Sequence, residues 1–258
     1  MIFQKMTWTE LKEVDFSRTT VLIPTGAMEQ HGPHLPVDTD TLLVTKLAEE
    51  AERRNTGTLL LAPTVWLGHS PHHLSFGGTL SAQHQVYIQM IVSVCRSFIG
   101  MGAERIWLLN GHGGNHNPLS IVLQELKNDY APVVVVASEY WSIAREEIAE
   151  IRESGLGGLG HACELETSLY LYLNGDQVRR ERIQDDGIQP DSPLFHIDMQ
   201  HGTVASRVYN FRELTSSGVF GRPTLATVEK GERLFRAISD KLQAFADQIH
   251  ALGRSNRP

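Results

Sequence analysis

The chain has 258 residues, which is long enough to bury a sizeable core, and we expect a single domain over residues 1–258. Its formal net charge of −7 and the lack of any basic run argue against nucleic acid and anionic membranes as partners, which leaves a small molecule or a peptide. Two cysteines do not make a disulfide framework, and no apolar run approaches roughly 18 residues, so we expect a soluble, cytoplasmic protein.

The apolar spacing predicts alternating strands and helices along most of the chain. This alternation is typical of a parallel sheet covered by helices on both faces, which is an α/β fold. In chain order, we expect a short helix capped by Thr7 or Thr9, strands over 19–24, 58–62, 105–109 and 132–137, and helices from 39 or 40 to 53 and over 83–101, 115–126, 143–153, 164–173 and 226–252.

Three stretches lack this regular spacing. Residues 63–79 form a long loop rich in Gly, Pro, Ser and His, and such loops are uncommon unless they are functional. Six residues at 155–160, four of them glycine, break regular structure. Residues 175–221 predict loop or irregular strand, with aromatic side chains that belong either to the core or to an interface: Phe195, Tyr209, Phe211 and Phe220.

The most informative stretch is 29–40, which follows the first predicted strand and contains two histidines and three carboxylates. Glu29 and His31 are two residues apart, so their side chains point the same way in an extended segment, and Asp40 lies near a helix N-terminus. Imidazole and carboxylate ligands suit zinc, manganese or iron. Because open α/β sheets bind ligands at the carboxyl ends of their strands, we interpret Glu29, His31 and Asp40 as ligands of a catalytic metal site.

A second polar segment, 110–115, follows the third predicted strand. We interpret His112 within it as a further metal ligand, because two strand ends that terminate in titratable residues favour a metal site over a chance acidic loop. Gly113 and Gly114 permit close approach of the backbone to a ligand and leave amides free for an oxyanion, so we assign them to substrate binding.

The remaining histidines and glutamates carry weaker signals. His73 fits substrate binding and loop packing equally well, and His34 fits either a supporting hydrogen bond to a ligand or loop packing. Glu164 and Glu166 straddle one residue, so on a helix only one of them faces the site while the other braces it. We expect ordinary surface or hydrogen-bonded roles for seven histidines: His69, His72, His84, His116, His196, His201 and His250.

Three segments together, 26–36 with Asp40, 110–115 and 160–168, resemble the creatininase (creatinine amidohydrolase) family in order and spacing. Residues 77–81 resemble that family's Pro-Gly-Thr loop, with Gly77 in place of the proline. The resemblance runs from about Trp8 to about Leu173. It implies a three-layer α/β/α fold with a mainly parallel central sheet, two divalent metal ions, and a homo-oligomer, often a hexamer.

In the pattern of this family, Glu29, Asp40 and His112 hold one metal, and His31 and Asp40 hold the second. A hydroxide shared by the metals attacks the carbonyl of a cyclic amide, an amide or a lactone-like substrate. The resemblance assigns His161 as the general acid or base that serves the leaving nitrogen, and we place Glu166 with it as a catalytic residue.

Two positions depart from the creatinine-hydrolysing members. Those members have an aromatic residue at the position of Gly113, and at the position of Gly114 a carboxylate that binds the second metal. We hypothesise that Glu164 replaces the missing ligand. The glycine pair belongs to the broader family, which includes formamide deformylases, a peptidase-like member, and hydrolases of keto-sugar or lactone-like rings.

Two other functions stay open. An isomerase or lyase acting on a keto-sugar shares the same metal site, and a small-molecule binding protein without catalysis is less favoured because a binder has no need of four such ligands.

Overall fold

A four-stranded parallel sheet forms the centre of the computed structural model, which describes residues 1–192, 194–201 and 204–252. The strand order is β2-β1-β3-β4. Thr25 of β1 pairs with Asn110 of β3, which pairs with Glu139 of β4, so these three strands end level at one edge. The strands are β1 (Thr20–Thr25), β2 (Leu59–Leu61), β3 (Arg105–Asn110) and β4 (Val134–Glu139).

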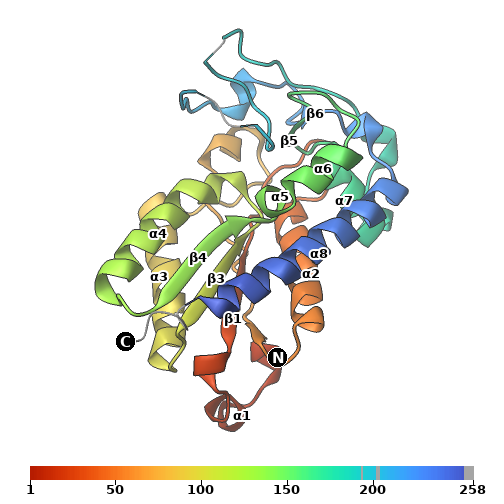
Figure 1. Cartoon of the computed structure of the whole chain (residues 1–258). Coiled ribbons are helices and arrows are strands. Elements are labelled where there is room, and N and C mark those ends of the chain that lie inside the picture. Colours follow the sequence, from red (N-terminus) through yellow and green to blue (C-terminus); the bar gives the residue numbers. More distant parts are fainter. Residues whose placement is uncertain (193, 202–203, 253–258) are drawn as a thin grey trace.

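Helices cover both faces of this sheet (Figure 1). One face carries α3 and α4, and the other carries α2, α7 and α8, with α5 and α6 near its edge. The helices are α1 (Trp8–Lys12), α2 (Thr39–Arg54), α3 (His84–Gly100), α4 (His116–Asp129), α5 (Tyr140–Ile143), α6 (Arg145–Ile151), α7 (Glu164–Asn174) and α8 (Val228–Ala251). The predicted three-layer α/β/α arrangement is confirmed.

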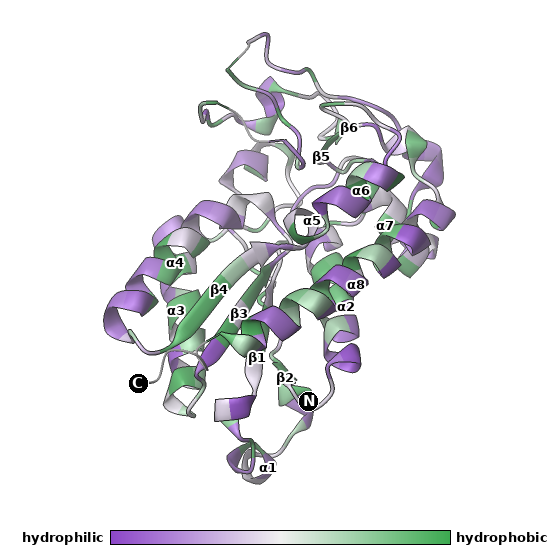
Figure 2. Ribbon diagram, in the orientation of Figure 1, coloured by the Kyte–Doolittle hydropathy of each residue, from purple (hydrophilic) through white to green (hydrophobic). Residues whose placement is uncertain are grey.

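Alternating side chains of the central strands fill two separate cores. Leu22 of β1 and Trp107 of β3 face α2 and α8, whereas Ile23 and Ile106 face α3 and α4. Because both faces of the sheet are covered, successive residues of β1 and β3 are buried, and both strands are apolar along most of their length. Figure 2 shows the same pattern, with hydrophobic strands between helices whose outer faces are hydrophilic.

Most predicted elements match within one to three residues, and two stretches differ. The stretch 143–153 forms two short helices that meet at Ala144 instead of one. The glycine-rich stretch contains a strand that was not predicted, β5 (Leu159–His161), which pairs with β6 (Phe220–Gly221). A Cβ on Gly160 would lie 2.4 Å from the ring of Phe220, so only glycine fits this pairing.

The segment between α7 and α8 runs past the carboxyl ends of the strands, at the top of Figure 1. It is mostly irregular, as predicted, with a 3₁₀ turn at Phe211–Glu213. Among the described residues, no helix is both long enough and apolar enough to cross a membrane.

Candidate metal centre

Two glycines bring the first turn of α2 against the ends of two strands. A Cβ on Gly26 would lie 2.7 Å from the Cα of Thr41, and one on Gly111 would lie 2.7 Å from the Cβ of Val44. Because neither position has room for a side chain, α2 packs directly on the segments that follow β1 and β3. Asp40, in the first turn of α2, is thereby held between the two strand ends.

The four ligands predicted from the strand ends meet at this place, and all four side chains are buried. Asp40 Oδ1 lies 3.2 Å from His31 Nε2, and Asp40 Oδ2 lies 2.9 Å from His112 Nδ1. Glu29 Oε1 lies 3.4 Å from His112 Nδ1. Asp40 therefore lies between the two imidazoles.

Glu166 joins this group from the first turn of α7. Its Oε1 lies 3.7 Å from His31 Nε2, and one donor atom from each of His31, Asp40 and Glu166 lies within 4.8 Å of the others. Glu29 and His112 form a similar group with His72, a histidine for which we expected no role at the site. Glu29 and His31 form a third group with His161, so three overlapping groups of donors lie in the described part of the chain.

The structure places Glu164, which we predicted as a metal ligand, in a separate set of hydrogen bonds. Its carboxylate accepts hydrogen bonds from the backbone amides of Glu153 and Ser154 at 3.0 and 2.9 Å, and its Oε1 lies 2.7 Å from Lys230 Nζ. Burial opposes the charge on Glu164, but these donors lower its pKa. Glu164 therefore ties the start of the glycine-rich stretch to α8, and Glu166 is the glutamate that faces the cluster.

Three buried polar atoms at the centre of the cluster have no partner outside its own ionisable groups: Glu29 Oε2, His31 Nε2 and Asp40 Oδ2. His31 Nδ1 lies 3.2 Å from the carbonyl oxygen of Glu29, and His112 Nε2 lies 3.2 Å from the carbonyl oxygen of His69. Because a carbonyl oxygen only accepts, each imidazole carries a proton on this outer nitrogen and turns its other nitrogen to the carboxylates. Metal-binding histidines are held in this way, so the residues fit a metal ion.

The electrostatics of the cluster also favour a cation. Burial opposes a charge on His112, but Glu29 and Asp40 outweigh it and raise the pKa of the imidazole to about 10. Burial likewise opposes a charge on His31, and Asp40 and Glu166 raise its pKa well above the usual value. Because the buried carboxylates attract positive charge this strongly, a divalent cation can replace these protons.

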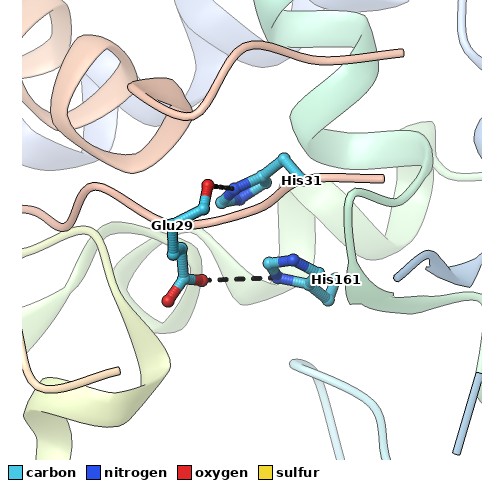
Figure 3. A group of neighbouring side chains, drawn as sticks. All are labelled: Glu29, His31 and His161. Atoms are coloured by element: carbon cyan, nitrogen blue, oxygen red, sulfur yellow. Dashed lines mark hydrogen bonds and ion pairs between the residues drawn. The ribbon is translucent and has the colours of Figure 1, made fainter. Parts of the chain in front are cut away.

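Two further histidines approach Glu29 from the other side. His161 Nδ1 lies 3.6 Å and His73 Nε2 lies 3.3 Å from Glu29 Oε1, and the two rings stack with centroids 4.2 Å apart. Burial lowers the pKa of both imidazoles, so both are neutral near pH 7. Figure 3 shows the Glu29 side chain turned toward His161, with His31 on the same segment of chain.

A cavity of about 170 Å³ opens on this cluster. Its polar wall includes three of the four predicted strand-end ligands, but not His31, together with the predicted catalytic residues His161 and Glu166 and the predicted substrate-binding residues His73, Gly113 and Gly114. The apolar wall comes mainly from the segment between α7 and α8, together with one residue of α5: Trp141, Ile197, Met199 and Phe211.

The two glycines after His112 differ in the space around them. A Cβ on Gly114 would lie 2.2 Å from the carbonyl oxygen of His69 and 2.5 Å from His112 Nε2, whereas nothing lies within 4 Å of a Cβ on Gly113. Only glycine at position 114 therefore leaves room for the His69 backbone beside the ring of His112, and no side chain can enter the site from that position.

Sequence reasoning missed several residues at the site. Gln30 is buried and lies between Glu29 and His31 in the sequence. Because an amide does not titrate, only its position between these two residues could have indicated a role at the site. Ser70 Oγ lies 3.0 Å from His112 Nε2, and nothing in the loop sequence distinguishes it from other serines. The ring of Phe211 lies 4.0 Å from that of His73, whereas Phe220, which we placed with it, is a core residue.

Comparison with known families decides what kind of protein this is. The model of the creatininase family, described as creatinine amidohydrolase, matches residues 4–246. The chain belongs to the creatininase family. The resemblance expected from the motifs is thereby confirmed, and it extends well beyond Leu173, over nearly the whole chain.

Its relatives are hydrolases with different substrates. A mycofactocin precursor peptide peptidase from Mycobacterium ulcerans is 32% identical over 234 residues, which are 86% of this chain and 82% of that protein. A 3-dehydro-scyllo-inosose hydrolase from Thermotoga maritima is 28% identical, over 96% of this chain and 83% of that one.

Solved creatininases share the fold and contain metals. A manganese creatininase has a TM-score of 0.76, and a mutant creatininase of the Zn–Zn type has a TM-score of 0.77; each is 25% identical, with 96% of both chains covered. Together with the buried ligand cluster, these relatives identify the chain as a metal-dependent hydrolase of the creatininase family.

Proposed function

We propose that this creatininase-family member is a dinuclear metal hydrolase that cleaves a carbon–nitrogen bond next to a carbonyl group in a small molecule. Glu29, His112 and Asp40 would hold one ion, and His31, Asp40 and Glu166 the other, with Asp40 shared. The assignment moves Glu166 from the predicted catalytic role to that of a ligand. Zinc, manganese and iron all suit imidazole and carboxylate donors.

The observation that carries this proposal is the set of unpaired polar atoms at the centre of the cluster. Glu29 Oε2 is buried without a hydrogen bond, and His31 Nε2 and Asp40 Oδ2 contact only other ionisable groups of the cluster; such groups are costly to bury unless something binds them. Glu29 and His31 come from the segment after β1, and Asp40 comes from the first turn of α2. A pair of cations supplies the missing partners.

When bound here, two divalent ions lower the pKa of a water molecule and polarise the substrate carbonyl. His161 does the proton transfer. Its Nε2 lies 2.7 Å from the backbone oxygen of Gln30, so this nitrogen carries the proton and Nδ1 presents its lone pair to the cavity. Because the imidazole is neutral, Nδ1 can take a proton from the attacking water and pass it to the leaving nitrogen.

The cavity limits what part of a substrate reaches the metals. Its volume of about 170 Å³ and its apolar cover of Trp141, Met199 and Phe211 suit a small molecule or the end group of a larger one. Gly113 leaves open the space that an aromatic side chain would occupy, so the site is not shaped for creatinine. Amides, formamides, cyclic imides and short peptides are the substrates to test first.

A second candidate reaction is ring opening of a keto-sugar or a lactone-like compound. The relative from Thermotoga maritima, a 3-dehydro-scyllo-inosose hydrolase, aligns with 96% of this chain and favours this candidate. The same ligands and the same proton transfer at His161 serve either reaction.

Chelation and isotope labelling test the proposal together. We expect a chelator to abolish hydrolysis of the best substrate, zinc or manganese to restore it, and labelled oxygen from water to enter the product. Activity that survives complete metal removal would contradict the metal mechanism. A product without labelled oxygen would show an isomerase or lyase instead.

A further inference from the structure

The side-chain amide of Gln30 has only one orientation that satisfies its surroundings. Its Oε1 lies 2.9 Å from the backbone amide of Gly32, and its Nε2 lies 3.1 Å from the carbonyl oxygen of Gly218. The first neighbour only donates and the second only accepts. A reversed amide would place donor against donor and acceptor against acceptor, so the observed orientation is fixed.

This orientation decides where His73 carries its proton. Gln30 Nε2 also lies 2.8 Å from His73 Nδ1, and since the amide nitrogen only donates, Nδ1 must accept. The proton of the neutral imidazole then lies on Nε2, which is 3.3 Å from Glu29 Oε1. Both side chains are 1% exposed, so water does not compete for this contact.

The neighbouring His161 does not disturb this assignment. Gln30 Nε2 lies 3.1 Å from His161 Nε2, but the backbone oxygen of Gln30 lies closer to the same nitrogen, at 2.7 Å. Because a carbonyl oxygen only accepts, His161 Nε2 donates to it and cannot also accept from the amide. The two amide protons of Gln30 therefore go to His73 and Gly218.

We propose that Gln30 is a positioning residue that holds His73 as the neutral tautomer protonated on Nε2, so that His73 donates to Glu29 and is not itself a metal ligand. Glu29 Oε1 is thereby fixed, and Oε2, which makes no hydrogen bond, remains available to a cation. The inference rests on the proposed function only in taking Glu29 as a ligand. Both nitrogens of His73 are engaged, although the ring lies as close to Glu29 as His112 does.

The chain of contacts reaches a loop far from the cluster in sequence. Gly218 has a φ of +88°, and a Cβ there would lie 2.0 Å from Gln30 Oε1, so only glycine lets this backbone hold the amide. The adjacent Ser217 donates from its backbone amide and its hydroxyl to Asp186, at 2.9 and 2.7 Å. The backbone at Gly218 thus helps to orient Gln30, and through Gln30 and His73 it acts on Glu29.

The tautomer can be measured directly in the metal-free protein, in which a failure of the metal proposal has no effect. Long-range nitrogen–proton correlation spectra of protein with isotope-labelled histidine distinguish the two tautomers, and a His73→Gln variant identifies the signals. We expect His73 to be protonated on Nε2 only. A wild-type spectrum in which the His73 proton is on Nδ1 overturns the proposal.

Substitution of Gln30 then tests its role. In Gln30→Glu the group facing His73 becomes an acceptor, so Nδ1 gains a proton; in Gln30→Met the fixed preference for Nε2 is lost. Gln189→Glu is the control, because its amide pairs with the backbone of Ile197 and should leave His73 unchanged. If Nδ1 stays unprotonated in both Gln30 variants, Gln30 does not hold His73. Lost support for a ligand should also weaken zinc binding by about 10–100-fold.

Discussion

Gly114 shows how a single position without a side chain shapes the metal centre. A methyl group there would meet the His69 carbonyl and His112 Nε2, so we expect Gly114→Ala to lower the free energy of unfolding by about 1–3 kcal/mol and to weaken metal binding. Gly113→Ala is the matched control, because its Cβ meets nothing. Thermal or denaturant unfolding of both variants measures the difference. Equal stability of the two would contradict this description of the loop.

The two glutamates at the start of α7 have opposite roles. Glu166→Gln should cost the protein one metal per chain, because Glu166 faces His31 and Asp40. Glu164→Gln should keep both metals but lose about 1.5–3 kcal/mol of stability, since its charge-assisted bond with Lys230 disappears. Metal analysis and unfolding of the two variants, side by side, test both statements. Metal loss in Glu164→Gln with full occupancy in Glu166→Gln would reverse the assignment.

At this scale the sequence could predict the ligands at the strand ends but not the choice between these glutamates. Glu29 and His31 follow β1 and His112 follows β3, so their position at the sheet edge follows from chain order, and Asp40 lies at the start of the next helix. Glu164 is turned away by a lysine 66 residues further along the chain, and no local pattern indicates such a partner.

Asp186 connects two parts of the irregular segment between α7 and α8 by hydrogen bonds. Its Oδ2 accepts hydrogen bonds from the hydroxyl groups of Thr215, Ser216 and Ser217 at 2.8, 3.0 and 2.7 Å. Burial opposes the charge, but these bonds outweigh it and lower the pKa of the carboxyl group. The contribution to stability is therefore fully present above the unfolded pKa of about 3.9 and is lost as the pH falls through the lower folded value.

We accordingly expect Asp186→Asn to be less stable than the wild type by about 1–3 kcal/mol at pH 7, with the difference shrinking below about pH 4. Unfolding by denaturant across this pH range measures it. A difference that stays constant down to the lowest pH would show that the charge of Asp186 does not contribute. Asp185→Asn is a suitable control, because that carboxylate is exposed and bonds only to Thr224 among the described residues.

The elements around the sheet follow from apolar periodicity, whereas the small second sheet does not. Strand β5 has three residues, one of them Gly160, and β6 has two, which is too short for any alternation to be visible. Their pairing depends on the fit of Phe220 against Gly160, a contact between residues distant in sequence. For the same reason, the position of Phe211 over His73 could not be expected from the chain alone.

For the whole molecule, the level ends of β1, β3 and β4 gather the ligands at one edge, and the irregular segment covers them. The fold class was predictable because strands and helices alternate, but the path of that segment was not. It leaves three large aliphatic residues highly exposed, Ile188, Val204 and Val208, at 73, 84 and 91%. We therefore predict a homo-oligomer, in which these residues are covered, and light scattering that gives the mass of one chain would refute it.

The central claim is that two metal ions share Asp40. Anomalous diffraction from crystals of the zinc- or manganese-loaded protein tests it most directly. We expect two peaks, both in contact with Asp40, one of them bound by Glu29 and His112 and the other by His31 and Glu166. A single peak, or a pair of peaks that does not include Asp40 between them, would contradict the account.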